Sequence, residues 1–309
     1  MKRAVVAGVL LVAGISTLSA RTPGQQPEGY PAIGAPAIVK LISAGAAPRS
    51  ALRYAVPADA KEHMDMNMNM SMSMDMGGMS VPAMAVPGMK FGADLAVTAI
   101  SSAGDLTYTM GFTGVIVEAG ADPAIAAQLQ GMSDFMKTVT GSVTLSNRGV
   151  VRTANLDLGK LANSEFAQIL GSTSETLKNV TTPFPEEEVG VGARWEVRQA
   201  LESGGVKMYQ KTEFELVAID GKTATLKTTV EQTAPPQSVS NPAMPSGAEI
   251  QLQKMTGTGS GALTVRLNGL VPTSNVNMES TMVMQIDFGG ETRQMSATTS
   301  LKMSVAPGK

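Results

Sequence analysis

A run of alternating methionines is the part of this chain whose residue types and spacing most clearly suggest chemistry. The stretch "HMDMNMNMSMSMDMGGM", residues 63–79, has a methionine at every second position from Met64 to Met76. Thioether sulfur is a soft, neutral ligand that selects Cu(I) over harder divalent metals. On an extended strand, neighbouring methionines of one face lie about 6.8 Å apart, a gap that their flexible side chains can close. The tract therefore predicts a Cu(I) site with ligands from one set: His63, Met64, Met66, Met68, Met70, Met72, Met74 and Met76.

The same alternation also fits the wall of an apolar cavity, with Met inward and Asp, Asn or Ser outward. Methionine fills irregular apolar space and adapts to varied guests, so a methionine-rich wall suits a hydrophobic ligand. Methionines recur in other alternating segments, and we expect these to line the same cavity: Met110, Met208, Met278, Met282, Met284 and Met303.

A third interpretation of the tract is a loop or frayed hairpin without function. No Val, Ile, Thr or aromatic residue stands between Glu62 and Ser80, and Asn, Asp and Gly are poor strand formers. A strand over the thirteen residues from Met64 to Met76 would measure about 44 Å, against roughly 17–20 Å for an ordinary strand. The residues alone leave the three interpretations open.

The rest of the composition argues against most enzyme classes. The chain has no Cys and one His, so it lacks the ligands for an ordinary zinc or haem site. "GTGSG", residues 257–261, has the wrong register for a nucleophile elbow, and "DGKT", residues 220–223, lacks the first glycine of a phosphate loop. "EEE", residues 186–188, lies in a Pro-flanked loop, where we expect a solvated run. We therefore expect a protein that is not an enzyme and has no cofactor, unless it binds Cu(I).

The amino terminus has the features of an export signal. A positive start is followed by the apolar run "AVVAGVLLVAGI", and "STLSA" offers cleavage after Ala20. Residues 1–20 are therefore expected to be a signal peptide, and residues 21–50 a flexible leader rich in Pro, Gly and Ala, with a short helical turn near Ile38 to Ile42. No later segment has some 18 uninterrupted apolar residues, so we expect no stable membrane span after the signal is removed. The mature protein is expected in the periplasm or outside the cell.

From residue 51 onward the apolar pattern repeats mostly every second residue, which is typical of antiparallel strands. "LTYTMGFTGVIV", residues 106–117, predicts one face made of Leu106, Tyr108, Met110, Phe112 and Ile116. Glycine-containing turns such as "DG" and "GGE" separate such runs and predict hairpins. The last of these hairpins places methionines on one face both before and after "GGE".

Two segments break this pattern and have helical spacing, near residues 123–137 and 164–178. The predicted fold class is α+β, mostly β: a curved, half-barrel-like antiparallel sheet with two helices packed on one face. We expect residues 51–306 to form a single β-rich domain with a methionine-rich insert at 63–80, and Trp195 and Phe214 to be buried in it.

"PFPEEEVGVGARWEV", residues 183–197, followed by "ELVAIDGKTATL", resembles a family of uncharacterised exported bacterial proteins. The resemblance extends over residues 51–306. The order of strands and helices is also similar to the LolA/LppX-like envelope proteins, in which a half-barrel closed by helices holds lipid. Both resemblances concern the scaffold, and no functional residue is carried over from either.

These observations favour a non-enzymatic exported protein that binds an apolar small molecule or lipid in the concave face of its sheet. The first alternative is a Cu(I)-binding protein, and the second is a structural or interaction module of the cell envelope. A formal charge of −2 gives no reason to expect nucleic acid as a partner. The sequence identifies no protein partner.

Overall fold

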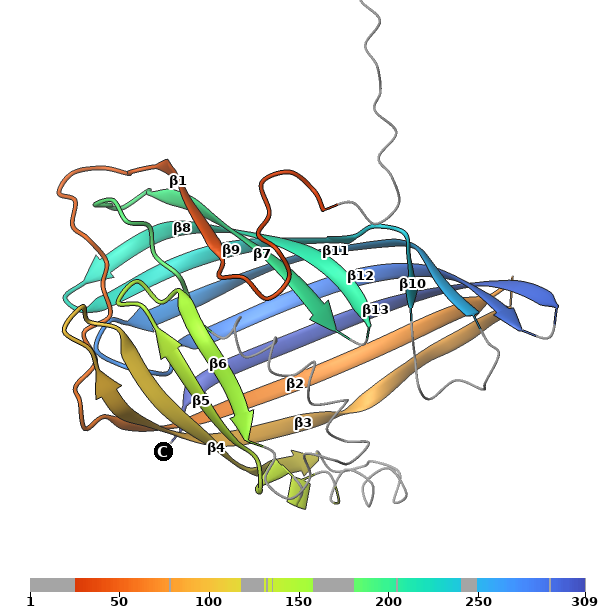
Figure 1. Ribbon diagram of the computed structural model, residues 1–309, viewed down its shortest axis with the longest axis horizontal. Coiled ribbons are helices and arrows are strands. Elements are labelled where there is room, and N and C mark those ends of the chain that lie inside the picture. The colour runs from red at the N-terminus through yellow and green to blue at the C-terminus, as the bar shows by residue number, and fades with distance from the viewer. Residues whose placement is uncertain are drawn as a thin grey trace, which may run out of the picture.

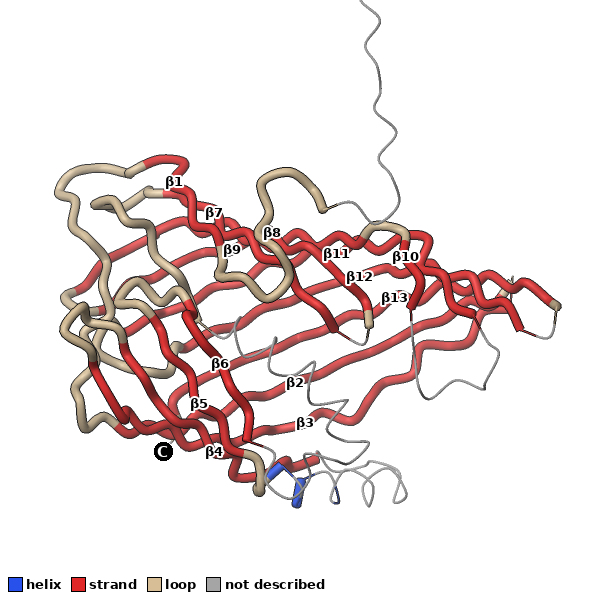
Figure 2. The backbone as a smooth tube through the Cα atoms, in the orientation of Figure 1, coloured by secondary structure: helices blue, strands red, loops and turns tan. Residues whose placement is uncertain are grey.

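The described strands all belong to one antiparallel sheet (Figures 1 and 2). The computed structural model describes residues 26–77, 79–117, 131, 133, 134, 136–157, 181–203, 205–239, 249–288 and 290–308. From edge to edge the strand order is β1–β7–β8–β9–β11–β12–β13–β2–β3–β4–β5–β6, and β10 pairs with β11 beside this path. The strands are β1 (Ile38–Ser43), β2 (Lys61–Met76), β3 (Met79–Ile100), β4 (Leu106–Val117), β5 (Thr140–Leu145), β6 (Val151–Asp157), β7 (Arg194–Ser203), β8 (Val206–Asp220), β9 (Thr223–Ala234), β10 (Gln237–Val239), β11 (Glu249–Arg266), β12 (Thr273–Phe288) and β13 (Glu291–Pro307).

Hairpins build most of this sheet, as the turn residues predict. Gly221 between β8 and β9 and Gly290 between β12 and β13 have φ of 55° and 84°, a conformation that glycine adopts without strain. β2 and β3 are joined in the same way at Gly77, with φ of 62°. The pairing that joins the two halves of the sheet is that of β13 with β2, since these strands lie far apart in the sequence.

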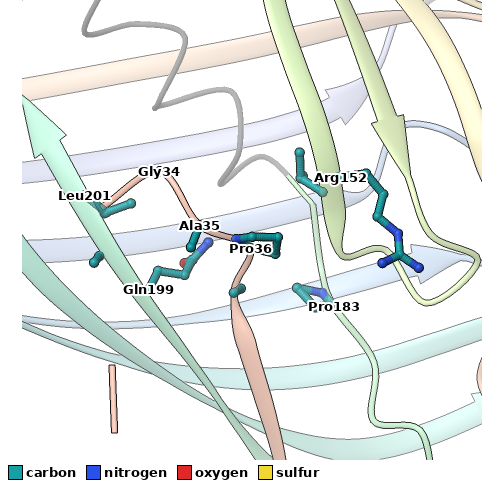
Figure 3. A pocket seen from close by; sticks show the side chains of 10 residues that line it. Gly34, Ala35, Pro36, Arg152, Pro183, Gln199 and Leu201 are labelled. Carbon is teal, nitrogen blue, oxygen red and sulfur yellow. The ribbon is translucent and has the colours of Figure 1, made fainter. Parts of the chain in front are cut away.

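The sheet curves strongly, and its two ends approach each other. Val151 and Arg152 of β6 line the same small cavity as Gln199 to Leu201 of β7, although β6 and β7 lie near opposite ends of the strand order (Figure 3). The inner face, which carries Leu216, Leu226 and Met64, is called the concave face below, and the opposite face the convex face.

Loops and the main core fill the space at one end of the concave face. This end is called the closed end below. The segments 44–60 and 181–193 cross it, on the left of Figure 1. Tyr54 packs against two core clusters, one built on β2 to β6 and the other on β7, β8, β9 and β11, so both halves of the sheet contact the same loop. The core therefore lies where the sheet wraps around these segments.

The predicted burial of Trp195 and Phe214 is confirmed. Trp195 is fully buried and stacks on Phe214 with ring centroids 5.6 Å apart. Its indole Nε1 donates a hydrogen bond to the carbonyl of Pro183 at 2.9 Å, and its ring also contacts Phe184. The "PFPEEEVGVGARWEV" motif is therefore structural: it brings a loop back over the first residues of β7.

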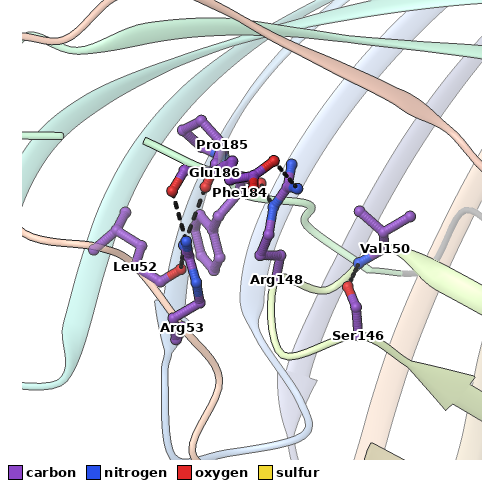
Figure 4. A network of polar contacts seen from close by, with 8 residues as sticks. All are labelled: Leu52, Arg53, Ser146, Arg148, Val150, Phe184, Pro185 and Glu186. Carbon is purple, nitrogen blue, oxygen red and sulfur yellow. Dashed lines mark hydrogen bonds and ion pairs between the residues drawn. The ribbon is translucent and has the colours of Figure 1, made fainter. Parts of the chain in front are cut away.

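Two arginines hold this loop at the closed end (Figure 4). The Arg53 guanidinium donates to the carbonyls of Leu52, Pro185 and Glu186, and Arg148 donates to the carbonyl of Phe184. Desolvation lowers the pKa of Arg53 from its ordinary value, with a further contribution from the neighbouring Arg148 charge. The carboxylates of residues 186–188 are exposed, as expected of a solvated run.

Two expectations about local structure are wrong. Residues 38–43 form strand β1, paired with β7, and not a helical turn, because the edge of β7 offers hydrogen-bonding partners to an apolar segment. Ile116 is 69% exposed, whereas Val115 is buried. The ladder between β3 and β4 shifts register at Gly92/Ala93, opposite Gly114 with φ of 137°, so the bulge turns Val115 inward in place of Ile116.

The predicted layer of two helices is not supported by the described part of the chain. No helix is among its elements, although Gly131, Ser133, Asp134 and Met136 have helical backbone at the end of the first predicted segment. The predicted helix near 164–178, and most of the one near 123–137, lie outside the described residues, as does the expected signal peptide. The fold is therefore mostly β, with one large antiparallel open sheet.

In the described ranges, no helix is both long enough and apolar enough to cross a membrane.

Candidate functional site

The methionine tract is strand β2 and pairs on both sides, with β13 and with β3. The interpretation of the tract as a loop is therefore wrong. Poor intrinsic strand propensity is overridden here because hydrogen bonds to both neighbours and packing on one face stabilise the extended backbone. The ladders shift register twice, between Met68 and Met70 and between Met72 and Met74, and the extra residues lie on β3.

The methionines of β2 all face the concave side, and methionines of six other strands share that face. The strand registers place them together because cross-strand partners point to the same side of a sheet. This set, called the methionine wall, consists of Met64, Met66, Met68, Met70, Met72, Met74, Met76, Met89, Met110, Met208, Met255, Met278, Met282, Met284, Met295 and Met303.

The wall changes from packed core to partly open surface along β2. Met64 at the closed end is 7% exposed, the methionines from Met66 to Met74 are half-buried, and Met76 at the far tip is 49% exposed. Beside them on β13 lie Val305, Leu301 and Ala297, so the apolar surface is continuous across the strands. The convex face of β2 carries Asp, Asn and Ser instead, as the cavity interpretation predicts.

The six methionines expected to line a cavity occupy three environments. Met110 is 4% exposed and belongs to the closed-end core, so it contributes to packing and not to an open wall. Met208, Met282 and Met284 pack beside a third cluster made of Val206, Ala234, Leu252 and Met255. Met278 and Met303 are half-buried on the open part of the concave face.

Methionines of different strands stand directly opposite each other in two rows. Met68 pairs with Met303 of β13 on one side and with Met89 of β3 on the other. Nearer the tip, Met76 pairs with Met295, which pairs in turn with Met284. Directly opposed side chains have Cβ atoms about 4.5–5.5 Å apart, closer than the spacing along one strand. Methionines opposed across neighbouring strands are therefore better placed to bind one ion together than methionines that follow each other along β2.

His63 lies on the opposite face from the methionines. Its Nδ1 is 2.6 Å from Asp94 Oδ1 and its Nε2 is 3.5 Å from Asp65 Oδ1, both on the convex side. Adjacent residues of a strand point to opposite faces, so the ring is turned away from Met64. His63 is thus not placed to add a donor to a site on the methionine wall. Among the described residues, no group of His, Asp and Glu is arranged to hold a metal ion.

The pKa of His63 is raised above its ordinary value. The largest cause is the hydrogen bond to Asp94, and the charges of Asp94 and Asp65 add to it. Because the folded-state pKa lies above the unfolded one, the ion pair contributes stability below the unfolded pKa, and this is lost as pH rises through the folded pKa. We expect the single histidine signal in a proton NMR titration to give a pKa above 6.5. Asp94→Asn should lower that pKa, and an unchanged titration in this variant would show that the pair does not form.

The described cavities are too small for an organic ligand. The one in Figure 3 measures about 20 Å³, and a second, beside Tyr54, Met64 and Tyr108, about 30 Å³. Each has room for about one or two water molecules. An open groove of about 700 Å³ lies over β2 to β5, lined in part by Lys61, His63 and Asp94. These charges suit an apolar ligand poorly, so the open concave face is the better candidate.

A family model described as "Family of unknown function (DUF6263)" matches residues 127–271, slightly under half of the chain. This confirms the expected resemblance to an uncharacterised family, whereas the likeness to LolA/LppX-like proteins finds no support. No curated protein matches the sequence.

Three solved structures share long but very distant alignments with this chain. One is described as "Asymmetric conductivity of engineered proteins" (6% identity, 79% of this chain and 100% of that chain, TM-score 0.20). The others are OpdQ of Pseudomonas aeruginosa (6%, 80% and 98%, 0.20) and OccAB3 of Acinetobacter baumannii (5%, 80% and 99%, 0.19). At these TM-scores the likeness carries no argument about fold or function.

Proposed function

We propose that this chain is a non-enzymatic exported protein that binds an apolar small molecule or lipid on the concave face of its sheet. The observation that carries the proposal is the methionine wall, where side chains of seven strands share one face. Flexible, polarizable thioethers adapt to ligands of varied shape, as at other promiscuous binding surfaces. A rigid core would be served better by branched residues, which have fewer rotamers.

The polarity of the two faces supports this assignment. The concave side of β2 presents Met from residue 64 to 76, whereas its convex side presents Asp, Asn and Ser. Asn67 on the convex side donates a hydrogen bond to Ser304 of β13 at 3.2 Å. An apolar face of this extent that stays half-buried is unusual on a soluble protein and is typical of a binding surface.

The sparse titratable groups on the concave face favour binding over catalysis. Glu62 accepts hydrogen bonds from Arg266 at 2.7 Å and from the Val271 backbone at 3.1 Å, which commits its carboxylate to the closed end. Burial raises the pKa of Tyr108 to about 12, so this hydroxyl stays protonated at neutral pH. The Glu62 carboxylate is therefore engaged in these contacts, and the Tyr108 hydroxyl is a weaker acid than that of an ordinary tyrosine.

A direct test is the uptake of a neutral fluorescent apolar dye by the purified mature protein. We expect saturable binding with an increase in dye fluorescence, and competition by long-chain lipids. A protein that takes up no dye would instead fit a structural or interaction module of the envelope.

The second candidate is Cu(I) binding, and the opposed methionine rows favour it. Met303, Met68 and Met89 come from three neighbouring strands and could supply three thioethers to one ion. These sulfurs are neutral and lack the stronger imidazole donor, because His63 faces the other way. We therefore expect weak binding at several positions.

Replacing Met64, Met66, Met68, Met70 and Met72 with Leu separates the two candidates. Leu keeps the apolar volume and removes the sulfur. In an anaerobic Cu(I) titration against a competing chelator, metal binding should be weakened in this variant, which keeps only the row of Met76, Met295 and Met284, while dye binding should survive. His63→Ala should leave Cu(I) binding unchanged. Equal Cu(I) affinity in the Leu variant and the parent would exclude copper binding by the tract.

A further inference from the structure

A row of residues, five of them with polar side chains, crosses the mostly apolar concave face. Strand registers align Gln199 of β7, Gln210 of β8 and Gln232 of β9, and continue to Gly257, Ser280 and Thr299 on β11, β12 and β13. Thr299 pairs in turn with Met72 of β2, where the row meets the methionine wall. These six residues, from Gln199 to Thr299, are called the polar row below.

The row has hydrogen-bonding capacity left over. Gln232 Nε2 donates to Gln210 Oε1 at 2.7 Å, and Gln210 Nε2 donates to Thr212 Oγ1 at 3.1 Å, which fixes both amides. Gln232 Oε1 then points over Gly257, where an added Cβ would lie 3.3 Å from it. Within the described ranges this oxygen and the hydroxyls of Ser280 and Thr299 have no hydrogen-bonding partner.

A buried hydroxyl on the same face of β9, four residues from the row, is also unsatisfied. Thr228 precedes Gln232 by four residues on β9, so both side chains face the same side, and Thr228 is only 5% exposed. Its Oγ1 has no hydrogen-bonding partner. A buried polar atom without a partner is costly, so native structures usually retain one for a reason.

The row is surrounded by uncharged residues. On the described concave positions of β7, β8, β9, β11, β12, β13 and β2, charge is confined to Glu62 at the closed end and to Arg293 and Glu291, which form an ion pair near the far tip. Arg266 already pairs with Glu62. A charged ligand group at the row would lose hydration without gaining a counter-charge, whereas an uncharged one needs only hydrogen bonds.

We infer that the polar row holds the uncharged polar group of an amphipathic ligand, whose hydrocarbon chain lies along the methionine wall toward the closed end. The inference rests on the proposed function and narrows its ligand class. From Met72 to Met66, where the half-buried wall meets the packed core, the wall runs six residues, about 20 Å at roughly 3.4 Å per residue, which accommodates a long alkyl chain. Gln232 positions the polar group through its free carbonyl oxygen, so this group must carry a donor such as a hydroxyl or amide.

Three probes of equal chain length test the inference by displacement of the neutral dye: a monoacylglycerol, the corresponding fatty acid at pH 8, and the corresponding alkane. We expect the monoacylglycerol to bind most tightly. Gln232→Leu should weaken its binding about tenfold, the value of one hydrogen bond in a site sheltered from water, and should leave the alkane unaffected. The matched control is Thr233→Leu, the next residue of β9, which is exposed on the convex face.

The outcomes separate the inference from the proposed function. If the parent protein binds neither dye nor alkane, both are overturned. If it binds dye and alkane, the proposed function stands. In that case, a fatty acid that binds as tightly as the monoacylglycerol, or a Gln232→Leu variant that binds as the parent does, overturns only the role of the polar row in ligand binding. Fluorescence of Trp195, the single tryptophan, reports whether each variant retains its core.

Discussion

Met70→Glu should abolish binding of the neutral dye, whereas Ser71→Glu, one residue further along β2, should leave it unchanged. Met70 is half-buried on the concave face between Leu301 of β13 and Val86 of β3. A carboxylate there would place an unpaired charge in the middle of the apolar surface, and a ligand would have to desolvate it. We expect at least a hundredfold loss of affinity in a fluorescence titration.

The paired variants make this result specific to one face of the sheet. Ser71 pairs with Ser300 on the polar convex side, so an added charge there remains hydrated. Met70→Leu should bind as the parent does. Equal loss of binding in Met70→Glu and Ser71→Glu would mean that the dye does not occupy the concave face.

The largest effect on stability is expected from Trp195→Ala. The indole is fully buried, stacks on Phe214 and donates a hydrogen bond to Pro183, so its removal leaves a cavity and an unpaired carbonyl. We expect the free energy of unfolding to fall by about 3–5 kcal/mol. Urea unfolding followed by far-ultraviolet circular dichroism measures this without relying on tryptophan fluorescence.

Two further substitutions define the origin of that loss. Trp195→Phe keeps an aromatic ring but loses the hydrogen bond, and should cost about 1–3 kcal/mol. Val191→Ala, in the same motif but 49% exposed, should change stability by less than about 0.5 kcal/mol. A small loss in Trp195→Ala would contradict the assignment of the motif as the structural closure of the sheet.

Much of the fold could be predicted because alternation and glycine turns are local signals. The β8–β9 and β12–β13 hairpins, and the burial of Trp195 and Phe214, follow directly from them. Strand β1 cannot be predicted from local signals because its stability comes from a partner, β7, more than 150 residues away in the sequence. The misplaced Ile116 has a similar cause, since a bulge depends on the register of the neighbouring strand.

The arrangement of the methionines could be predicted in part. The position of every methionine of β2 on one face follows from the alternation, and so does the opposite orientation of His63, which the copper hypothesis overlooked. The strand itself is improbable from propensity and length alone, because the pairing to β13 that stabilises it is not a local signal. The polar row could not be predicted at all, because its members come from six strands whose registers only the folded sheet defines.

Extraction of the purified mature protein with organic solvent, followed by mass spectrometry, tests the central claim most directly. The account predicts a co-purified apolar or neutral amphipathic molecule in stoichiometric amount, which is absent from Met70→Glu purified in parallel. Recovery of no such molecule from the parent, together with no uptake of the neutral dye, would contradict ligand binding on the concave face.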